Sequence, residues 1–465
     1  MDVLLLTSID PYAYQIIPDL GLMYLASSLR EQGFTARIRD CRKEGIGEDD
    51  LAAFLRETRP GVVGIKCYSN EVKRVGRMAK LARELLPESL IVVGGPHPSM
   101  DPKGTLTRMP EVDYAFVGEA ELSLSRLLAW RREGQPGPLP EAVRGIAFRS
   151  ETGTQVRPPV FEEDLDRLPL PAWDLCPPKT YPDEAAGIFV PAFPAAPLML
   201  SRGCPFRCGY CGGRYITGGR LRYRSARNVL REIELLEREY GVRTFTFVDD
   251  NFTWDRKRAM ELFQALAERP RRIAFTFPNG VRADSLDEEL LKMMERAGCY
   301  LFALGIESGS DATLARMKKN QTVAQVREAV ALARRATKIL VTGFFLLGYP
   351  GETIADVKNT IRFAVELPLH HAHFCMFIPL AGTPAHEEIK AQGFWTDVNY
   401  DPEDMTIDRH AFSLPGLPAA QLIRLHRWAY IRFYLQPWRL ISLVRQFQSL
   451  SHFRVALRRF IKLFR

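Results

Sequence analysis

Short apolar runs alternate with helix-spaced segments over the first 145 residues. The runs have the length of buried strands and lie at 3–6, 36–39, 62–66, 90–95 and 114–118. Between them, apolar residues recur every three or four positions, which indicates amphipathic helices. This alternation predicts an α/β domain built on a doubly wound parallel sheet over residues 1–145. Ligands of such sheets bind beyond the carboxyl ends of the strands.

The pattern changes between residues 146 and 197. Ten of the chain's 32 prolines lie between 151 and 200. Proline is incompatible with helix interiors and central strands, so we predict a Pro-rich linker over 146–197.

The alternation of strands and helices resumes from residue 198 to 385. Six strands are expected, and two helices have capping-box starts, Ser285 with Glu288 and Thr322 with Gln325. The predicted strands are 198–201, 244–248, 274–278, 300–305, 340–346 and 373–378. Six βα units predict a partial (β/α)6 barrel of the TIM type with its active site at the carboxyl ends of the strands. Residues 386–465 are expected to be mainly helical.

Three of the eight cysteines, Cys204, Cys208 and Cys211, are crowded into the segment CPFRCGYC directly after the first barrel strand. Thiolates are soft ligands suited to iron–sulfur clusters or zinc. Structural zinc sites usually have four ligands, and no second Cys or His pair follows. Three thiolates would instead leave one iron of a [4Fe–4S] cluster open.

This CxxxCxxC motif at the top of a six-strand partial barrel resembles the signature of radical S-adenosylmethionine (SAM) enzymes. The resemblance implies that the three cysteines hold a [4Fe–4S] cluster whose open iron binds SAM. It also implies reductive cleavage of SAM to a 5′-deoxyadenosyl radical, with an electron donor such as flavodoxin or ferredoxin.

Segments at the ends of later strands resemble the same family, namely FVDDNFT, VRAD, LGIESGS and LLGYPGET. The carboxylates among them can accept hydrogen bonds from SAM, and an arginine can pair with its carboxylate. The SAM-binding residues implied are Tyr210, Asp249, Asp250, Arg282, Glu307 and Ser308.

The first domain, followed by this barrel, resembles the Rossmann-like domain of cobalamin-binding radical SAM enzymes. The resemblance rests on residues 18–34, 92–99 and 117–124 and implies a cobalamin site. The usual DxHxxG motif appears as Asp40, Arg42 and Gly45, so arginine stands where histidine would ligate cobalt. Cobalamin should therefore bind without a histidine ligand. A second segment, the loop of Gly94, Gly95 and His97, is expected to approach the corrin.

The resemblance implies an enzyme that methylates an unactivated carbon of a small molecule, using the adenosyl radical and methylcobalamin. The alternatives are a cobalamin-dependent radical SAM cyclase or rearrangement enzyme and a non-catalytic cobalamin- or cluster-binding protein. Methylthiotransferases are disfavoured because they need three further cysteines in the first domain, which has only Cys41 and Cys67.

The net charge of +8 is concentrated at the C-terminus, where residues 409–465 hold eleven Lys or Arg and no Asp or Glu. On a helix, Phe453, Leu457, Phe460 and Phe464 would share one face and basic residues another. This pattern is typical of a peripheral membrane helix, which would favour a hydrophobic substrate. It also suits a helix packed on the barrel, and nucleic-acid binding is disfavoured.

With no signal peptide or spanning segment, we expect a cytoplasmic protein that could contact the inner face of the membrane.

Overall fold

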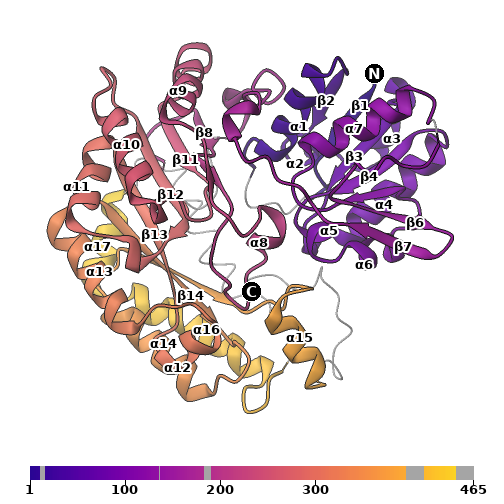
Figure 1. Ribbon diagram of the computed structural model, residues 1–465. Helices are drawn as coiled ribbons and strands as arrows, with labels where there is room; N and C mark the ends of the chain where they lie inside the picture. Colours follow the sequence, from indigo (N-terminus) through magenta and orange to yellow (C-terminus); the bar gives the residue numbers. More distant parts are fainter. Residues whose placement is uncertain (11–15, 136, 183–189, 394–412, 447–465) are drawn as a thin grey trace.

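Two α/β lobes lie side by side in the computed structural model, which describes residues 1–10, 16–135, 137–182, 190–393 and 413–446 (Figure 1). The first lobe is a doubly wound sheet, the second a six-stranded partial barrel, and helices complete the C-terminal region. The expected fold class is therefore confirmed.

The first lobe contains a seven-stranded sheet in the order β2-β1-β3-β4-β5-β6-β7, in which the first five of these strands are parallel. Its strands are β1 (Val3–Leu6), β2 (Ala36–Arg39), β3 (Val62–Lys66), β4 (Leu90–Gly94), β5 (Tyr114–Phe116), β6 (Ile146–Ser150) and β7 (Gly153–Arg157). The helices are α1 (Leu20–Glu31), α2 (Cys41–Glu44), α3 (Glu48–Thr58), α4 (Val72–Leu85), α5 (Pro96–Met100), α6 (Pro102–Arg108) and α7 (Glu121–Arg132).

Strands β1 to β5 fall within the five predicted runs, but β6 and β7 form an antiparallel hairpin in the range predicted to be linker. The hairpin lies at the sheet edge, and none of the residues of β7 is buried. An edge strand of this kind lacks the continuous apolar run of a buried parallel strand, so the sequence pattern did not reveal it.

The proline-rich segment after β7 packs on both lobes. The indole of Trp173 donates to the Glu232 carboxylate of the barrel at 2.9 Å, and Trp173 is only 2% exposed. The Tyr181 hydroxyl donates to Asp40 of the first lobe at 3.2 Å. These buried contacts tie the connecting segment to both lobes.

The barrel sheet has the order β15-β14-β13-β12-β11-β8 and is parallel throughout. Its strands are β8 (Ala195–Leu198), β11 (Thr244–Phe247), β12 (Ala274–Val281), β13 (Cys299–Glu307), β14 (Leu340–Leu347) and β15 (His371–Met376), and β9 (Ser201–Arg202) pairs with β10 (Arg222–Tyr223). Its helices are α8 (Gly213–Ile216), α9 (Ala226–Tyr240), α10 (Arg256–Ala267), α11 (Glu288–Ala297), α12 (Asp311–Arg316), α13 (Val323–Ala336) and α14 (Ile354–Glu366). Strands β8 and β15 are the two sheet edges, so the barrel is open between them, as expected.

Two details of the predicted barrel need correction. The first strand, β8, ends where the predicted strand 198–201 begins, and Ser201 instead belongs to the short pair β9–β10. The Thr322 capping box is present, but α11 is capped by Asp287, which accepts from the backbone N–H of Leu290, so the Ser285 box is wrong.

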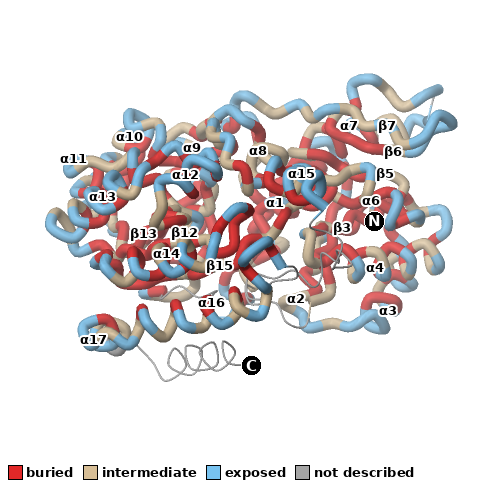
Figure 2. The backbone as a smooth tube through the Cα atoms, turned by 90° about the horizontal axis from the view of Figure 1, so that it is seen from below, coloured by how far each residue is buried: buried red, intermediate tan, exposed pale blue. Residues whose placement is uncertain are grey.

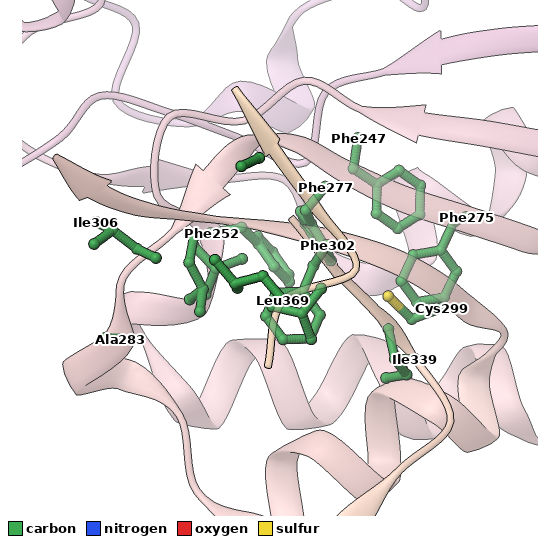
Figure 3. Packing of buried hydrophobic residues seen from close by; sticks show 14 of the residues in the cluster. Phe247, Phe252, Phe275, Phe277, Ala283, Cys299, Phe302, Ile306, Ile339 and Leu369 are labelled. Atoms are coloured by element: carbon green, nitrogen blue, oxygen red, sulfur yellow. The ribbon is translucent and has the colours of Figure 1, made fainter. Parts of the chain in front are cut away.

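Aromatic side chains fill the space between the barrel sheet and its helices (Figure 3). Phe247 and Phe275 stack with ring centroids 4.6 Å apart, and Phe275 and Phe263 stack at 5.8 Å. All three rings are fully buried. This core fixes the strands whose carboxyl ends carry the candidate site.

Helix α16 (Ala419–Tyr434) covers the backbone edge of β15, the last strand of the barrel sheet. In the chain, α16 is preceded by α15 (Pro384–Ala391) and followed by α17 (Pro437–Gln446). The Tyr430 hydroxyl accepts from the backbone N–H of Phe374 at 3.2 Å, and Tyr434 does the same for Ala372 at 3.3 Å. The His426 Nε2 lies 2.7 Å from the Phe374 carbonyl. Side chains four residues apart thus satisfy the open edge of the barrel.

The tail residues Phe453, Leu457, Phe460 and Phe464 lie outside the described residues. Within the described part of the chain, no helix is long and apolar enough to cross a membrane.

Candidate active site

The loop that carries the three cysteines, residues 203–213, leaves the carboxyl end of the first barrel strand. Gly203 has φ +96°, and a Cβ there would lie 2.1 Å from the Arg220 carbonyl oxygen, so only glycine fits. The Gly209 N–H donates to Met317 at 2.8 Å, and a Cβ on Gly209 would meet the Tyr349 hydroxyl at 2.8 Å. Tight backbone packing therefore fixes the course of this loop.

The three cysteines of the loop are candidate ligands for an iron–sulfur cluster. Cys204 and Cys208 are partly buried and Cys211 is exposed. In a [4Fe–4S] cluster each thiolate binds a different iron, so three thiolates leave one iron open. Partial burial raises the pKa of Cys204, and a bound iron would reverse that effect because a coordinated thiol is deprotonated.

Arg282 packs against the cysteine loop through Phe206. Its guanidinium lies 3.7 Å from the ring centroid of Phe206, and that ring meets Trp254 edge-on at 4.6 Å. The same guanidinium donates twice to Asp284, at 2.8 and 2.7 Å, and also to the backbone carbonyl of Lys319. Arg282 is 6% exposed and largely satisfied by protein, so its geometry is that of a loop support rather than of an open carboxylate receptor.

The two adjacent acids after β11 differ in their surroundings. Asp249 is buried and accepts from the backbone N–H of Leu200 at 3.1 Å and the hydroxyl of Ser201 at 2.7 Å. Burial raises the pKa of Asp249 to about 7. Asp250 is exposed beside the cysteine loop and accepts from Thr217 at 2.7 Å. Asp249 therefore joins two strand ends, whereas Asp250 can reach a ligand.

Asn251 is a candidate ligand contact that the sequence analysis did not select. It follows Asp250 directly and is 3% exposed, yet neither atom of its amide has a hydrogen-bond partner in the protein. Buried amides are nearly always paired, so a bound molecule or water is expected to supply the partner. This unpaired amide fits a polar cofactor such as SAM at the end of β11.

A buried lysine, Lys319, joins two of the predicted SAM-binding residues. Its ammonium donates to Glu307 at 2.9 Å and to the Tyr210 hydroxyl at 3.3 Å. Glu307, Lys318 and Asn320 have φ of 68°, 54° and 53°, which is rare for residues other than glycine. Strained backbone of this kind gathers at functional sites. No motif marked Lys319, because one sequence does not reveal which loop reaches Glu307.

Ser308 has a structural position. It is fully buried, its hydroxyl lies 3.1 Å from that of Thr360, and it accepts from the backbone N–H of Ser310. These bonds hold the turn after β13 and leave the side chain no access to a ligand.

At the carboxyl end of the first sheet, the residues of the altered DxHxxG motif pair with protein groups. Asp40 caps α2 and accepts from the Thr7 hydroxyl at 2.9 Å, and Gly45 ends α2 with φ +63°. Arg42 lies 3.4 Å from Asp40 and 3.7 Å from Asp19. Burial alone would raise the pKa of Asp19, but the neighbouring cations Lys66 and Arg42 lower it below its usual value. This network is no metal ligand set, because an arginine stays protonated.

The Gly94–Gly95 turn presses against the end of β3. Gly95 has φ +106°, and a Cβ on it would lie 3.2 Å from the Cys67 carbonyl. His97 follows in α5, is 1% exposed, and contacts the Ser69 hydroxyl through Nδ1 at 3.2 Å, while Nε2 has no partner in the protein. Burial lowers the pKa of His97 to about 4, so the imidazole is neutral near pH 7. A polar group on a bound cofactor fits this unpaired nitrogen.

Helix α5 also touches the cysteine loop. A Cβ on Gly212 would lie 2.6 Å from the Met100 sulfur, and one on Gly382 would lie 2.8 Å from the Met100 carbonyl. Figure 1 shows α5 and α8 facing each other between the two lobes. Helix α5, which follows the Gly94–Gly95 turn and holds His97, therefore brings the predicted cobalamin site next to the predicted cluster loop.

Four buried charges join the lobes at the same place. Arg222 pairs with Glu119 through two nitrogens, at 2.5 and 2.9 Å. Arg202 pairs with Glu119 at 3.3 Å and with Glu121 at 2.8 Å. All four side chains are at most 10% exposed. The acids follow β5 and the arginines flank the cysteine loop, so this interlobe ion network holds the two carboxyl-end surfaces together.

Comparison with known proteins agrees with this arrangement. The B12 binding domain family matches residues 12–128, and the Radical SAM superfamily matches residues 198–364. The chain is 31% identical to the "Uncharacterized methyltransferase PH0819" of Pyrococcus horikoshii, over 91% of this chain and 89% of the relative. The chain belongs to the cobalamin-binding radical SAM enzyme family. Its cofactors are accordingly a [4Fe–4S] cluster, SAM and cobalamin.

Two further relatives carry different activities in their names. Cytidylyl-2-hydroxyethylphosphonate methyltransferase of Streptomyces wedmorensis is 29% identical over 86% of this chain and 82% of the relative. Anaerobic magnesium-protoporphyrin IX monomethyl ester cyclase of Cereibacter sphaeroides is 29% identical over 81% of this chain and 61% of the relative. The solved structure of OxsB with aqua-cobalamin shares the fold, with TM-score 0.76 and 18% identity, over 100% of this chain and 71% of that one.

Proposed function

We propose that the protein is a methyltransferase that acts on a carbon atom of a small molecule where the carboxyl ends of the two sheets meet. The observation that carries this proposal is the contact between α5, which holds His97 and Met100, and the cysteine loop at Gly212. A methyl donor on the first sheet and a radical source on the barrel must reach one substrate. Methyl transfer is favoured over cyclisation because two of the three relatives compared are named methyltransferases.

In this proposal Cys204, Cys208 and Cys211 hold the cluster. When bound, the cluster, SAM and cobalamin supply the electron, the hydrogen abstraction and the methyl group. Asp250 and the amide of Asn251 hydrogen-bond SAM at the end of β11.

At the end of β13, Glu307 accepts a hydrogen bond from a ribose hydroxyl of SAM. Lys319 neutralises the charge of Glu307 and orients Tyr210. Asp249, Arg282 and Ser308 act as positioning residues, because their polar atoms are engaged with protein. The SAM contacts thus come from loops that those three residues hold in place.

The proposed cobalamin site has no protein ligand to cobalt. Gly94 and Gly95 allow the backbone to approach the corrin, and the free Nε2 of His97 binds a polar group of the cofactor. Asp40, Arg42 and Gly45 shape the adjacent loop through their own pairing.

The second candidate function is a radical cyclisation or rearrangement without methyl transfer, which the named cyclase relative favours. The two reactions differ in the mass of the product. Only methyl transfer adds a carbon derived from SAM.

The proposal extends to the surroundings of the enzyme. A reduced flavodoxin or ferredoxin donates electrons to the cluster, which the exposed Cys211 brings near the surface. The enzyme works in the cytoplasm on a hydrophobic substrate, with the basic tail near the inner face of the membrane.

The decisive experiment combines anaerobically reconstituted enzyme with reductant, SAM labelled in its methyl group, and extracts of candidate substrates. We expect 5′-deoxyadenosine together with a product that carries the label. A Cys208→Ser variant should form neither. Formation of 5′-deoxyadenosine with an unlabelled product of altered ring count would instead establish the cyclase alternative.

A further inference from the structure

Helices α16 and α17 expose large apolar side chains on their outer surface, although the solvent-facing side of a helix is usually polar. Eight large apolar side chains are notably exposed within the described residues, and five of them lie between positions 428 and 441. They are Trp428, Leu435, Trp438, Leu440 and Ile441, with exposed fractions of 39–67%. We call this set the α16–α17 apolar patch. Figure 2 shows both helices at the outside of the barrel lobe.

Helix α17 differs from a usual amphipathic helix, because it buries an arginine and exposes large apolar side chains. Among the side chains described for residues 437–443, Arg439 is the buried one, at 1% exposure, and it donates to the carbonyls of Leu367 at 2.6 Å and Val365 at 2.9 Å. These bonds join Arg439 to the end of α14, where Val365 also accepts from the side chain of Gln436 and Leu367 from the backbone N–H of Leu369. Its neighbours Trp438 and Leu440 point outward instead. Exposed apolar side chains gathered on two consecutive helices favour a surface that meets something other than water.

The positive charge around the patch indicates which kind of partner binds it. Arg424, Trp428 and Arg432 are spaced by four residues and exposed, so they form one outward stripe on α16. The sequence from residue 409 to the end contains eleven Lys or Arg and no acid. A second copy of this face would set arginine against arginine, and the chain's own tail is equally basic. An anionic partner is therefore favoured over either of these.

We propose that the α16–α17 apolar patch is a docking surface for an anionic lipid bilayer. The tryptophans and leucines enter the boundary between headgroups and acyl chains, and Arg424 and Arg432 pair with lipid phosphates. The patch does not include the predicted tail face of Phe453, Leu457, Phe460 and Phe464, and it lies partly on α16, which packs directly on the last barrel strand through Tyr430 and Tyr434. Docking there orients the barrel relative to the membrane.

The test is sedimentation of the full-length protein with vesicles of phosphatidylcholine alone or with added phosphatidylglycerol. We expect binding to the anionic vesicles only. Because each arginine at an anionic surface contributes roughly fivefold to binding, the variant Arg424→Gln with Arg432→Gln should bind at least about tenfold more weakly. The apolar variant Trp428→Ser with Leu435→Ser should also lose binding.

Matched controls separate the patch from general effects of charge and hydrophobicity. Arg227 and Arg231 are also exposed and four residues apart, on α9, and Val160 is an exposed apolar residue elsewhere. Arg227→Gln with Arg231→Gln, and Val160→Ser, should bind as the wild type does. Unchanged far-ultraviolet dichroism shows that each variant is folded.

Three results would overturn the proposal. They are the absence of wild-type binding to anionic vesicles, equal binding by patch variants and wild type, and a solution dimer that the Leu435→Ser change dissociates. The second result would assign binding to the tail, and the third would assign the patch to a second copy of the chain.

Discussion

The interlobe ion network gives a stability prediction that can be worked from the structure. Changing Glu119 to Gln removes the carboxylate that faces Arg202 and Arg222, whose side chains are 6% and 3% exposed. Breaking a buried ion pair from one side costs roughly 3–5 kcal/mol. We expect a loss near 3 kcal/mol in the free energy of unfolding, because Arg222 keeps its bonds to the carbonyls of Glu162 and Thr217.

A double-mutant cycle in urea unfolding isolates the contribution of the pair. The combination of Glu119→Gln with Arg222→Met should cost less than the two single changes added together, by roughly 1–3 kcal/mol. The exposed pair Arg256 and Asp287, 45% and 46% exposed, provides the control, where Arg256→Met should destabilise the protein far less than Glu119→Gln does. Additivity of the Glu119 and Arg222 changes within about 0.5 kcal/mol would refute the reasoning.

Three further predictions concern single side chains. Lys319→Met leaves the buried Glu307 carboxylate without its cation and should lower stability by roughly 3 kcal/mol. It should also weaken SAM binding in calorimetry, with partial rescue by Lys319→Arg, whereas an unchanged SAM affinity would show a purely structural role. The pKa of His97 is lowered to about 4 from its ordinary 6.5, so the fold is more stable when the imidazole is neutral. This contribution to stability is fully present above pH 6.5 and is lost as the pH falls toward 4. The wild type should therefore lose about 2 kcal/mol more than His97→Gln between pH 7 and pH 5 in urea unfolding, and parallel pH profiles would contradict this. Arg439→Met removes the buried donor to the Val365 and Leu367 carbonyls, which keep Gln436 and the Leu369 N–H as partners. It should cost roughly 1–2 kcal/mol, seen as a lower Tm that Arg439→Lys only partly restores, and an unchanged Tm would argue against a stabilising role.

The fold followed from the sequence wherever local pattern decides structure. Buried parallel strands are continuous apolar runs, so β1 to β5 and five of the six barrel strands fell close to the expected ranges. The hairpin β6–β7 escaped because an exposed edge strand needs no such run. The first barrel strand was misplaced because Leu200 and Ser201 are as buried as the strand they follow.

The candidate site was predicted only as far as motifs extend. The three cysteines were found because one short loop carries all of them. Lys319 and Asn251 were missed, because their importance lies in contacts, or missing contacts, with groups distant in the sequence. Nor does the sequence reveal that the guanidinium of Arg282, predicted to pair with a carboxylate of SAM, donates to Asp284 two residues away. Pairing across the fold is not visible in a single sequence.

The central claim is that one chain holds cobalamin and a [4Fe–4S] cluster on two facing surfaces. It is tested most directly by anaerobic purification with cobalamin supplied, followed by absorption spectra and metal analysis. We expect about four irons and about one corrin per chain. Removal of the cluster ligand in Cys208→Ser should lose the iron and keep the corrin. A protein that binds the cluster but no corrin would contradict the account and leave the first lobe with another role.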